Sequence, residues 1–419
     1  MATTKPRRKY YYYQKQLKFL VYLLSSQLIL IMRYNCKPLW TIVGLFLLLL
    51  VFCEYLVYYF VLWQCHWPEL ASDHDHEAVL KAFFIADTHL LGSRQGHWFD
   101  KLRREWQMHR GFVSANQLLN PEVVFFLGDL FDEGKWSRNE EFKSTVERFH
   151  SLFPFENNDN KVVVIGNHDV GFHYAVTPAK RKRFYKSFGL DTSGVRRFTL
   201  KNIHFVLVDS LAMHGDNCNF CQPAVSKVNE LAREIHCLNK KNDNKQSASA
   251  AALGNTNFQS ECEFVNYSED YSRPILLQHF PLFRISDENC HDEPDVLSNP
   301  KEKKRPFRPL WDCLSKESSD FLLEKFIPRL IISGHTHHGC RQLHQFHDHK
   351  IPEWSVASFS WRNRNNPVIV LATLTQDEFV LNKCYLPHES TVINVYIVGS
   401  IMILIYCILN SRRKWSRRF

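Results

Sequence analysis

Five short apolar runs of this sequence end abruptly in side chains that can bind a metal ion. The residues at these ends are Asp87 and His89, Asp129, Asn167 and His168, His279, and His335 and His337. Carboxylate oxygen, amide oxygen and imidazole nitrogen together suit Mn, Fe or Zn, whereas Mg and Ca prefer oxygen ligands alone. The set contains no cysteine, which argues against a structural zinc site. These residues therefore predict metal-dependent chemistry.

This set of ligands meets the needs of a two-metal hydrolase. Such an enzyme keeps its ions about 3.5–4 Å apart and needs a carboxylate that bridges them. Glycine precedes Asp129, Asn167 and His335, and glycine at a strand end lets the chain turn sharply and leaves room beside the ligands. A lone Asp or His at a strand end is commonly an ordinary hydrogen-bonded residue. Five such endings in order indicate a metal-binding site.

The elements that position these side chains are predicted to form a largely parallel sheet. Continuous apolar runs are typical of strands buried on both faces, and helical stretches at 99–119 and 139–153 alternate with the first three runs. In open α/β sheets the ligand site lies at the carboxyl ends of the strands, where all five polar endings fall. Later runs at 205–208, 368–374 and 379–381 lack such endings, so we expect them to be scaffold.

The order and spacing of the polar endings resemble the signature of the calcineurin-like metallophosphoesterases. The matching motifs are D-x-H at 87–89, G-D-x-x-D at 128–132, G-N-H-D at 166–169, a distal His279, and G-H-x-H at 334–337. The resemblance spans roughly residues 80–375. It implies an α/β fold, a four-layer α/β/β/α sandwich with two central mixed sheets.

The resemblance also implies a role for each residue of the site. The metal ligands would be Asp87, His89 and His337 on one ion, Asn167, His279 and His335 on the other, and Asp129 as the bridge. His168 would lie beside the substrate phosphate and stabilise or protonate the leaving group. Asp132 and Asp169 would orient histidine side chains from behind; Asp169 stands where many members have Glu, a change that such a position should tolerate. The cofactors implied are two divalent ions, Mn²⁺ ahead of Fe or Zn.

A closer resemblance links the chain to a membrane-bound branch of this family. It rests on the segments 86–92, 100–108, 131–136 and 360–367. It implies a phosphodiesterase that removes a side-chain ethanolamine phosphate from the second mannose of GPI anchors, with GPI-anchored proteins as substrates, in support of anchor remodelling and ER-to-Golgi transport. The alternatives are a luminal phosphoesterase acting on a nucleotide, a phosphoprotein or a lipid head group, and a non-catalytic cargo-binding module.

Two long apolar runs predict transmembrane helices at 41–63 and 391–409. They are 23 and 19 residues long, and the only Asp, Glu, Lys or Arg in either is Glu54; such lengths cross about 30 Å of hydrocarbon. A weaker run at 17–32 is interrupted by polar residues, so we expect it to be an interfacial segment. Between the spans we expect a linker at 64–79 and a globular domain at 80–388.

The basic residues gather in two tails. Residues 1–40 contain eight Lys and Arg, residues 410–419 contain five, and neither stretch has an acid. The other residues have 39 basic against 43 acidic side chains, so the net charge of +9 does not indicate a nucleic-acid partner. Because Lys and Arg beside a span are retained in the cytosol, both tails are predicted to be cytosolic, where they are available to transport machinery, and residues 64–390 luminal. Together with the resemblance to the membrane-bound branch of the family, this orientation implies a multi-pass protein of ER exit sites, the ER-Golgi intermediate compartment or the cis-Golgi.

Two further features agree with a luminal domain. Asn266 begins the one N-x-S/T glycosylation acceptor, and nine cysteines lie between the spans, which suits an oxidising compartment. Nine is odd, so at least one thiol is free or pairs outside the chain. Cys218 and Cys221 have the spacing of a redox or zinc pair, but we expect a local disulfide framework with Cys237 or Cys262. The polar stretch 239–260 is expected to be a surface loop.

The segment 361–365 is a candidate substrate-binding element. It follows an apparent strand and contains Trp361, Arg362 and Arg364. Arginine side chains are suited to phosphate, and the tryptophan ring offers a face to a sugar. The alternative interpretation is that Trp361 belongs to the core and that the arginines pair with surface acids.

Overall fold

The computed structural model describes residues 36–71, 78–247, 262, 270–290 and 294–416. The chain divides into two units, one formed by Met1–Leu56 with Ser390–Phe419 and the other by Val57–Glu389. The apolar run at 17–32, the glycosylation acceptor Asn266 and residues 248–260 of the predicted loop lie outside the described residues.

Helices near both termini are long and apolar enough to cross a membrane. The first runs through α2 (Cys36–Val51), a π-helical turn (Phe52–Leu56) and α3 (Val57–Leu62), and the second is α12 (Glu389–Ser416). Their apolar stretches, Leu39–Leu62 and Glu389–Asn410, are candidate membrane spans by length and composition and coincide with the predicted ones. The Tyr396 hydroxyl donates a hydrogen bond to Glu54, which gives this carboxylate a partner.

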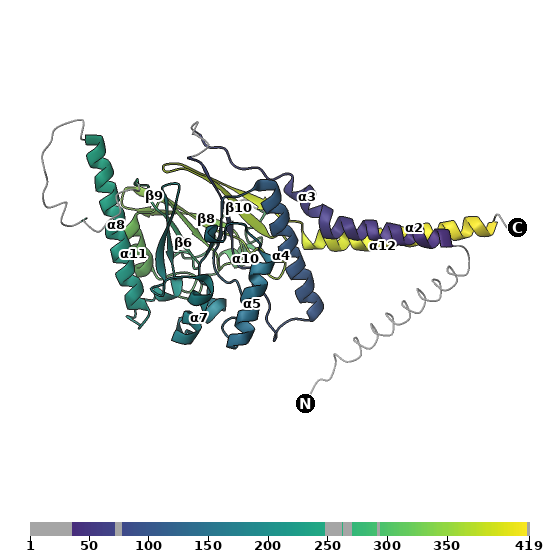
Figure 1. Ribbon diagram of the computed structural model, residues 1–419, viewed down its shortest axis with the longest axis horizontal. Coiled ribbons are helices and arrows are strands. Elements are labelled where there is room, and N and C mark those ends of the chain that lie inside the picture. The colour runs from purple at the N-terminus through teal and green to yellow at the C-terminus, as the bar shows by residue number, and fades with distance from the viewer. Residues whose placement is uncertain (1–35, 72–77, 248–261, 263–269, 291–293, 417–419) are drawn as a thin grey trace, which may run out of the picture. The chain divides into compact units, whose positions relative to one another are not determined.

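The described strands form two mixed sheets (Figure 1). The first has the order β11-β10-β1-β2-β3, in which β1, β2 and β3 are parallel and β10 is antiparallel to β1. Its strands are β1 (Leu80–Ile85), β2 (Val123–Phe126), β3 (Lys161–Val163), β10 (Val368–Leu374) and β11 (Phe379–Tyr385). The second has the order β4-β5-β6-β7-β9-β8, with β5, β6, β7 and β9 parallel. Its strands are β4 (Val195–Leu200), β5 (Ile203–Val208), β6 (Ile275–Gln278), β7 (Leu330–Ser333), β8 (Cys340–Phe346) and β9 (His349–Ser355).

The two sheets face each other across an aromatic and aliphatic core. Phe84 and Phe125 of the first sheet stack with ring centroids 4.9 Å apart, and Phe125 meets Phe205 of the second sheet at 4.6 Å. Strands β2, β5, β6 and β7 are buried along their whole length. Burial on both faces is the reason that these strands are continuous apolar runs instead of alternating ones.

Helices cover the outer face of each sheet. On the first sheet, Phe126 contacts Phe112 of α4 (Trp98–Leu119) at 6.3 Å and Phe149 of α5 (Asn139–Leu152) at 5.0 Å between ring centroids. On the second, α8 (Cys221–Ser247) and α11 (Lys316–Phe326) lie side by side (Figure 1). The layers are therefore α/β/β/α, and the predicted fold class is confirmed.

Helix α8 is longer than the sequence suggested. We predicted a surface loop from residue 239, but the helix continues to Ser247. The Lys and Gln residues of this stretch have good helix propensity, and each residue added to an existing helix gains a hydrogen bond without a new nucleation cost. The prediction of a loop was therefore wrong for residues 239–247.

Eight of the nine cysteines between the spans form disulfides. The pairs are Cys65–Cys384, Cys218–Cys221, Cys237–Cys262 and Cys290–Cys340, and Cys313 is a free buried thiol. We expected Cys218 and Cys221 to pair with Cys237 or Cys262, which was wrong. A turn at the start of α8 brings the Cα atoms of Cys218 and Cys221 to 4.9 Å, within the range that a disulfide needs.

Candidate metal centre

The predicted ligands follow five different strands and come together in the structure. They form two groups whose ligand atoms lie within 4.8 Å of one another: Asp87, His89, Asp129 and His337, and then Asp129, His279 and His335. Asn167 adjoins the second group, with its Oδ1 3.1 Å from His279 Nε2. Asp129 belongs to both groups, which is the position that a bridging carboxylate must occupy.

Three histidines of these groups hold one ring nitrogen against an oxygen atom. The contacts are His89 Nδ1 with Asp132 Oδ1 (3.2 Å), His279 Nδ1 with the Leu127 carbonyl (2.7 Å) and His335 Nε2 with the Trp311 carbonyl (2.7 Å). A nitrogen that donates to such an oxygen fixes the tautomer and leaves the lone pair of the other nitrogen available to a metal ion. The donor types and their orientation therefore fit a pair of divalent ions.

The backbone of the site adopts a conformation that is rare outside glycine. Five of the ligands have a left-handed φ: Asp87 (53°), His89 (45°), Asp129 (49°), His335 (72°) and His337 (62°). This conformation costs about 1–2 kcal/mol for a residue with a side chain. Such strain concentrates at functional sites, where the surrounding fold imposes it. Here it turns side chains from separate strands toward a common point.

Two of the glycines that precede ligands are required by close packing. Gly128 has φ +90°, and a Cβ there would lie 2.6 Å from His279 Nδ1. A Cβ on Gly166 would lie 2.2 Å from the Asp129 nitrogen. Neither position has space for a side chain, as the sequence predicted.

Burial shapes the protonation of the ligands. It raises the pKa of the Asp87 carboxyl to about 8 and lowers the pKa of the His335 imidazole to about 3. Both pKa values shift because burial disfavours the charged form of the side chain. A neutral imidazole is the form that binds a metal ion, and a divalent cation would offset the charge of the carboxylates.

His168 lies at the open side of the centre. Its backbone nitrogen donates to Asp129 Oδ1 at 2.6 Å, and its Nδ1 lies 3.2 Å from Asp132 Oδ1. Burial lowers the pKa of His168, but the carboxylates of Asp129 and Asp132 outweigh burial and raise the pKa above its usual value. The side chain is 27% exposed, so a protonated imidazole can reach a ligand that enters from solvent.

Asp132 and Asp169 take different positions behind the ligands. Asp132 contacts the ring nitrogens of both His89 and His168, as the resemblance implied. Among the described residues, the hydrogen-bond partners of the Asp169 carboxylate are backbone nitrogens and not a histidine ring. Its Oδ1 accepts from the Phe131 nitrogen at 2.9 Å and its Oδ2 from the Gly166 nitrogen at 2.8 Å. The expectation that Asp169 orients a histidine was therefore wrong; it fixes the backbone of two loops instead.

The three candidate substrate-binding residues of the 361–365 segment have different surroundings in the structure. Arg362 reaches the centre, where its Nη2 lies 2.8 Å from Asp132 Oδ2. Trp361 is 7% exposed, and its indole N–H donates to the Pro387 carbonyl, so its ring presents no open face to a sugar. Arg364 bonds Asn366 Oδ1. Residues 361–363 form a turn, and of the two arginines Arg362 is the one that contacts a residue of the centre.

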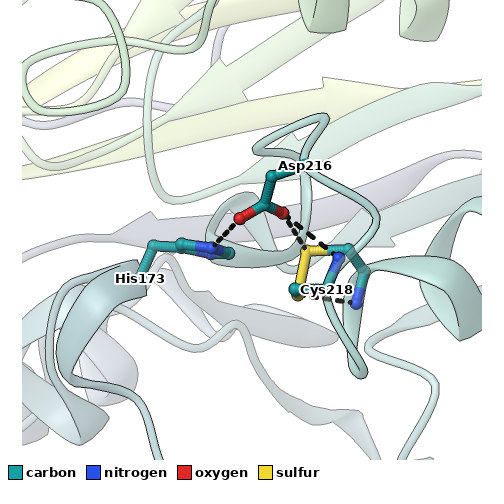
Figure 2. Close-up of side chains that lie close together, drawn as sticks. His173, Asp216 and Cys218 are labelled. Carbon is teal, nitrogen blue, oxygen red and sulfur yellow. Dashed lines mark hydrogen bonds and ion pairs between the residues drawn. A yellow bond between two sulfur atoms is a disulfide. The ribbon is translucent and has the colours of Figure 1, made fainter.

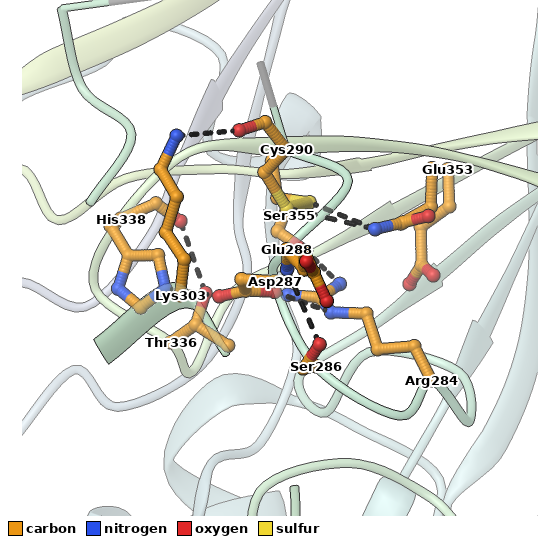
Figure 3. Close-up of a disulfide and its surroundings, with 12 residues drawn as sticks. Arg284, Ser286, Asp287, Glu288, Cys290, Lys303, Thr336, His338, Glu353 and Ser355 are labelled. Atoms are coloured by element: carbon orange, nitrogen blue, oxygen red, sulfur yellow. Dashed lines mark hydrogen bonds and ion pairs between the residues drawn. A yellow bond between two sulfur atoms is a disulfide. The ribbon is translucent and has the colours of Figure 1, made fainter. Parts of the chain in front are cut away.

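The loop that carries His335 and His337 is anchored from outside by a buried network (Figure 3). The His338 ring bonds the Asp287 carboxylate, which also pairs with Arg284 Nε at 2.8 Å. The Cys290–Cys340 disulfide joins the same two segments of chain. These residues escaped the sequence analysis because their partners are distant in sequence; the one local signal was His338 directly after the G-H-x-H motif.

Lys135 is a further cation at the centre that the sequence analysis missed. Its Nζ lies 3.1 Å from His168 Nδ1. The signal for it was its place in the 131–136 segment, three residues after Asp132. With Arg362 it provides positive charge at the open side of the centre, which suits an anionic ligand.

The fold and this centre define the class of the protein. The family model described as "Calcineurin-like phosphoesterase" matches residues 80–339. The chain therefore belongs to this family. It is a metal-dependent phosphoesterase.

Within the family, the chain is similar to proteins named "Metallophosphoesterase 1". It is 47% identical over 361 residues to that of Mus musculus, an alignment that covers 85% of each chain. It is 44% identical over 367 residues to that of Cricetulus griseus, covering 87% of this chain and 88% of the relative. It is 42% identical over 382 residues to that of Danio rerio, covering 91% and 94%. The relatives thus match most of the length of the chain.

Proposed function

We propose that this phosphoesterase removes a side-chain ethanolamine phosphate from the second mannose of GPI anchors. The observation that carries the proposal is the joint presence of a two-group ligand centre sharing Asp129 and of candidate membrane spans near both termini. An active domain tethered to a membrane meets a lipid-anchored substrate at a raised effective concentration. The motif segments quoted above, which resemble the GPI-processing branch of the family, give the substrate class.

The ligands would divide between two divalent ions. Asp87, His89 and His337 would hold one, Asn167, His279 and His335 the other, and Asp129 both. When bound, such a pair supplies an activated water nucleophile and offsets charge on the phosphoryl oxygens. The mixed oxygen and nitrogen donors suit Mn²⁺, and Fe or Zn would fit the same set.

The chain's own residues complete the reaction. Arg362 and Lys135 present positive charge to the phosphodiester at the open side of the centre. His168, the pKa of which is raised by the carboxylates of Asp129 and Asp132, would give a proton to the departing sugar oxygen as the phosphorus–oxygen bond breaks. Asp132 contacts both His89 and His168. It therefore fixes the position of the proton donor, His168, relative to His89, a proposed metal ligand. The products are a mannose hydroxyl and phosphoethanolamine.

The proposal includes a luminal orientation for residues 64–390. Basic tails on the cytosolic side, available to transport machinery, follow from the tendency of Lys and Arg to stay in the cytosol. The four disulfides agree with an oxidising compartment. We accordingly propose the early secretory pathway, from ER exit sites through the ER-Golgi intermediate compartment to the cis-Golgi, as its location.

Mass spectrometry of GPI glycans tests the proposal. Cells that lack the protein should retain ethanolamine phosphate on the second mannose. The wild-type chain should remove it, whereas Asp129→Asn, which lacks the shared carboxylate, should not. Glycans that are unchanged by loss of the protein, in cells where it is otherwise expressed, would contradict the proposal and direct attention to another phosphoester.

A further inference from the structure

Three aromatic rings form a surface beside the second ligand group. Phe172 precedes the short helical turn η3 (His173–Ala175), Tyr174 lies within it, and Trp311 comes from a separate loop. The ring centroid of Trp311 is 4.9 Å from that of Phe172 and 5.5 Å from that of Tyr174. Tyr174 is 72% exposed and Trp311 41% exposed. We call Phe172, Tyr174 and Trp311 the aromatic platform.

The aromatic platform is directly connected to the metal centre. The backbone carbonyl of Trp311 accepts the hydrogen bond that orients the His335 ring, at 2.7 Å. Phe280 fills the space below, with its ring centroid 4.1 Å from that of His335 and 6.3 Å from that of Phe172. A ligand that lies on the platform is therefore next to a residue of the second ligand group.

His173, which lies between Phe172 and Tyr174 in the sequence, holds this part of the aromatic platform in place. His173 Nδ1 lies 2.8 Å from the Leu211 carbonyl and His173 Nε2 2.8 Å from Asp216 Oδ2. The His173 ring also stacks on His214 at 3.8 Å. Asp216 in turn accepts from the Cys218 nitrogen, at the disulfide with Cys221 (Figure 2). Rings that are ordered before binding lose little conformational entropy when a ligand stacks on them.

Core packing does not account for the two outer rings. A tyrosine that is 72% exposed gains little from burial, and its position beside Trp311 enlarges an exposed apolar patch, a feature that marks interaction sites. Polar groups border the patch: Arg308 lies over the Trp311 ring at 5.4 Å and forms two hydrogen bonds of 2.9 Å with Asp312. Flat apolar faces with hydrogen-bonding groups at the edge match a pyranose, which has an apolar C–H face and hydroxyls at its rim.

We propose that the aromatic platform binds a sugar ring of the substrate glycan and so determines specificity on the His335 side of the centre. This assignment deepens the proposed function and rests on it. Tyr174 and Trp311 stack on the apolar face of the pyranose, and Arg308 and Asp312 bond its hydroxyls. The aromatic ring that the sequence analysis sought at Trp361 is thus supplied by residues of two other loops.

The test compares two substrates that differ only in the glycan. One is a soluble trimannosyl GPI fragment with ethanolamine phosphate on its second mannose, and the other is the methyl diester of phosphoethanolamine. The full-length protein in detergent cleaves each, and the selectivity is the ratio of the two kcat/KM values. Tyr174→Ala and Trp311→Ala should each lower this ratio about three- to tenfold, the scale of one aromatic contact. Tyr174→Phe, which keeps the ring, should preserve it.

The control is Trp98→Ala, which removes another exposed aromatic ring, 67% exposed and at the start of α4, and should preserve the ratio. An unchanged ratio in both Tyr174→Ala and Trp311→Ala would overturn the assignment. A loss that appears only with lipid-anchored substrate in vesicles would assign the rings to the membrane surface and overturn it as well. A wild-type protein that cleaves the methyl diester but not the glycan would refute the proposed function itself, whatever the variants do.

Discussion

Gly166 is a position where one added methyl group should disable the metal centre. A Cβ there would lie 2.2 Å from the Asp129 nitrogen and 2.3 Å from Asp129 Oδ1, more than about 1 Å inside ordinary contact. The Gly166 backbone is extended, with φ −116°, so alanine is conformationally allowed. The collision with the shared carboxylate is therefore the dominant effect of Gly166→Ala.

The size of the effect follows from this overlap. Overpacking of a rigid interior costs about 1–3 kcal/mol, and a displacement of about 1 Å in a catalytic group can lower the rate about 10²-fold. We expect purified Gly166→Ala to hold fewer metal ions per chain, measured by inductively coupled plasma mass spectrometry. Its hydrolysis of a small phosphodiester should fall about 10²-fold or more.

Gly189→Ala is the matched control. Gly189 ends α7 (Pro178–Phe188) with φ +62°, and no atom of the described residues lies within 4 Å of an added Cβ. Alanine there should cost about 1–2 kcal/mol of backbone strain and lower the melting temperature, while metal content and turnover stay at wild-type values. A Gly166→Ala protein with full metal content and full activity would refute the reasoning.

Three further predictions concern the proton donor, the arginines and the orientation. His168→Ala should keep its metal ions and lose about 10²-fold in turnover, the scale of a lost general acid; loss of the ions instead would make His168 a ligand. Arg362→Ala should lower kcat/KM on a small phosphodiester about tenfold or more, the scale of a charged hydrogen bond, whereas Arg364→Ala should stay within about twofold; equal losses would contradict the separation of the two side chains. Protease added to sealed microsomes should trim only the tails, and an N-glycanase should shift the protein's mobility through Asn266; cleavage within 80–388 would contradict the luminal orientation.

The ligand positions were predictable because each lies at or close to the end of a strand. An apolar run that stops just before Asp129 or His335 indicates a buried strand. The polar residue that follows indicates that the strand ends at a polar site. Strands β1, β2 and β3 belong to the first sheet and β6 and β7 to the second. The carboxyl ends of parallel strands lie at one side of a sheet, so local signals predicted which side chains meet within each sheet, and the family resemblance implied that the two sets meet. The runs and their alternation with helical stretches predicted a largely parallel sheet, whereas the two sheets and the four layers were implied by the family resemblance.

Contacts made through the backbone or between distant loops were not predictable in this way. The Trp311 carbonyl that orients His335 is present on any residue type, so the sequence contains no sign of it. Asp169 matched its motif, but whether a carboxylate bonds a ring or a backbone N–H depends on tertiary structure. The same holds for the aromatic rings. From the sequence, Trp361 and Tyr174 are equally plausible partners of a sugar, and the structure distinguishes them because Trp361 is buried and Tyr174 is exposed.

The strand order of the first sheet has a consequence for biosynthesis. Leu80 of β1 pairs with Leu374 of β10, and Cys65 pairs with Cys384 across 319 residues. At about 5–20 residues per second of translation, β1 is made roughly 15–60 s before its antiparallel neighbour, and until then this edge of β1 is open to pairing with another chain. Asp87 waits almost as long for His335 and His337. A newly made chain therefore brings the candidate ligands together only when the domain is nearly complete, and metal binding at this centre would mark a molecule that has finished folding.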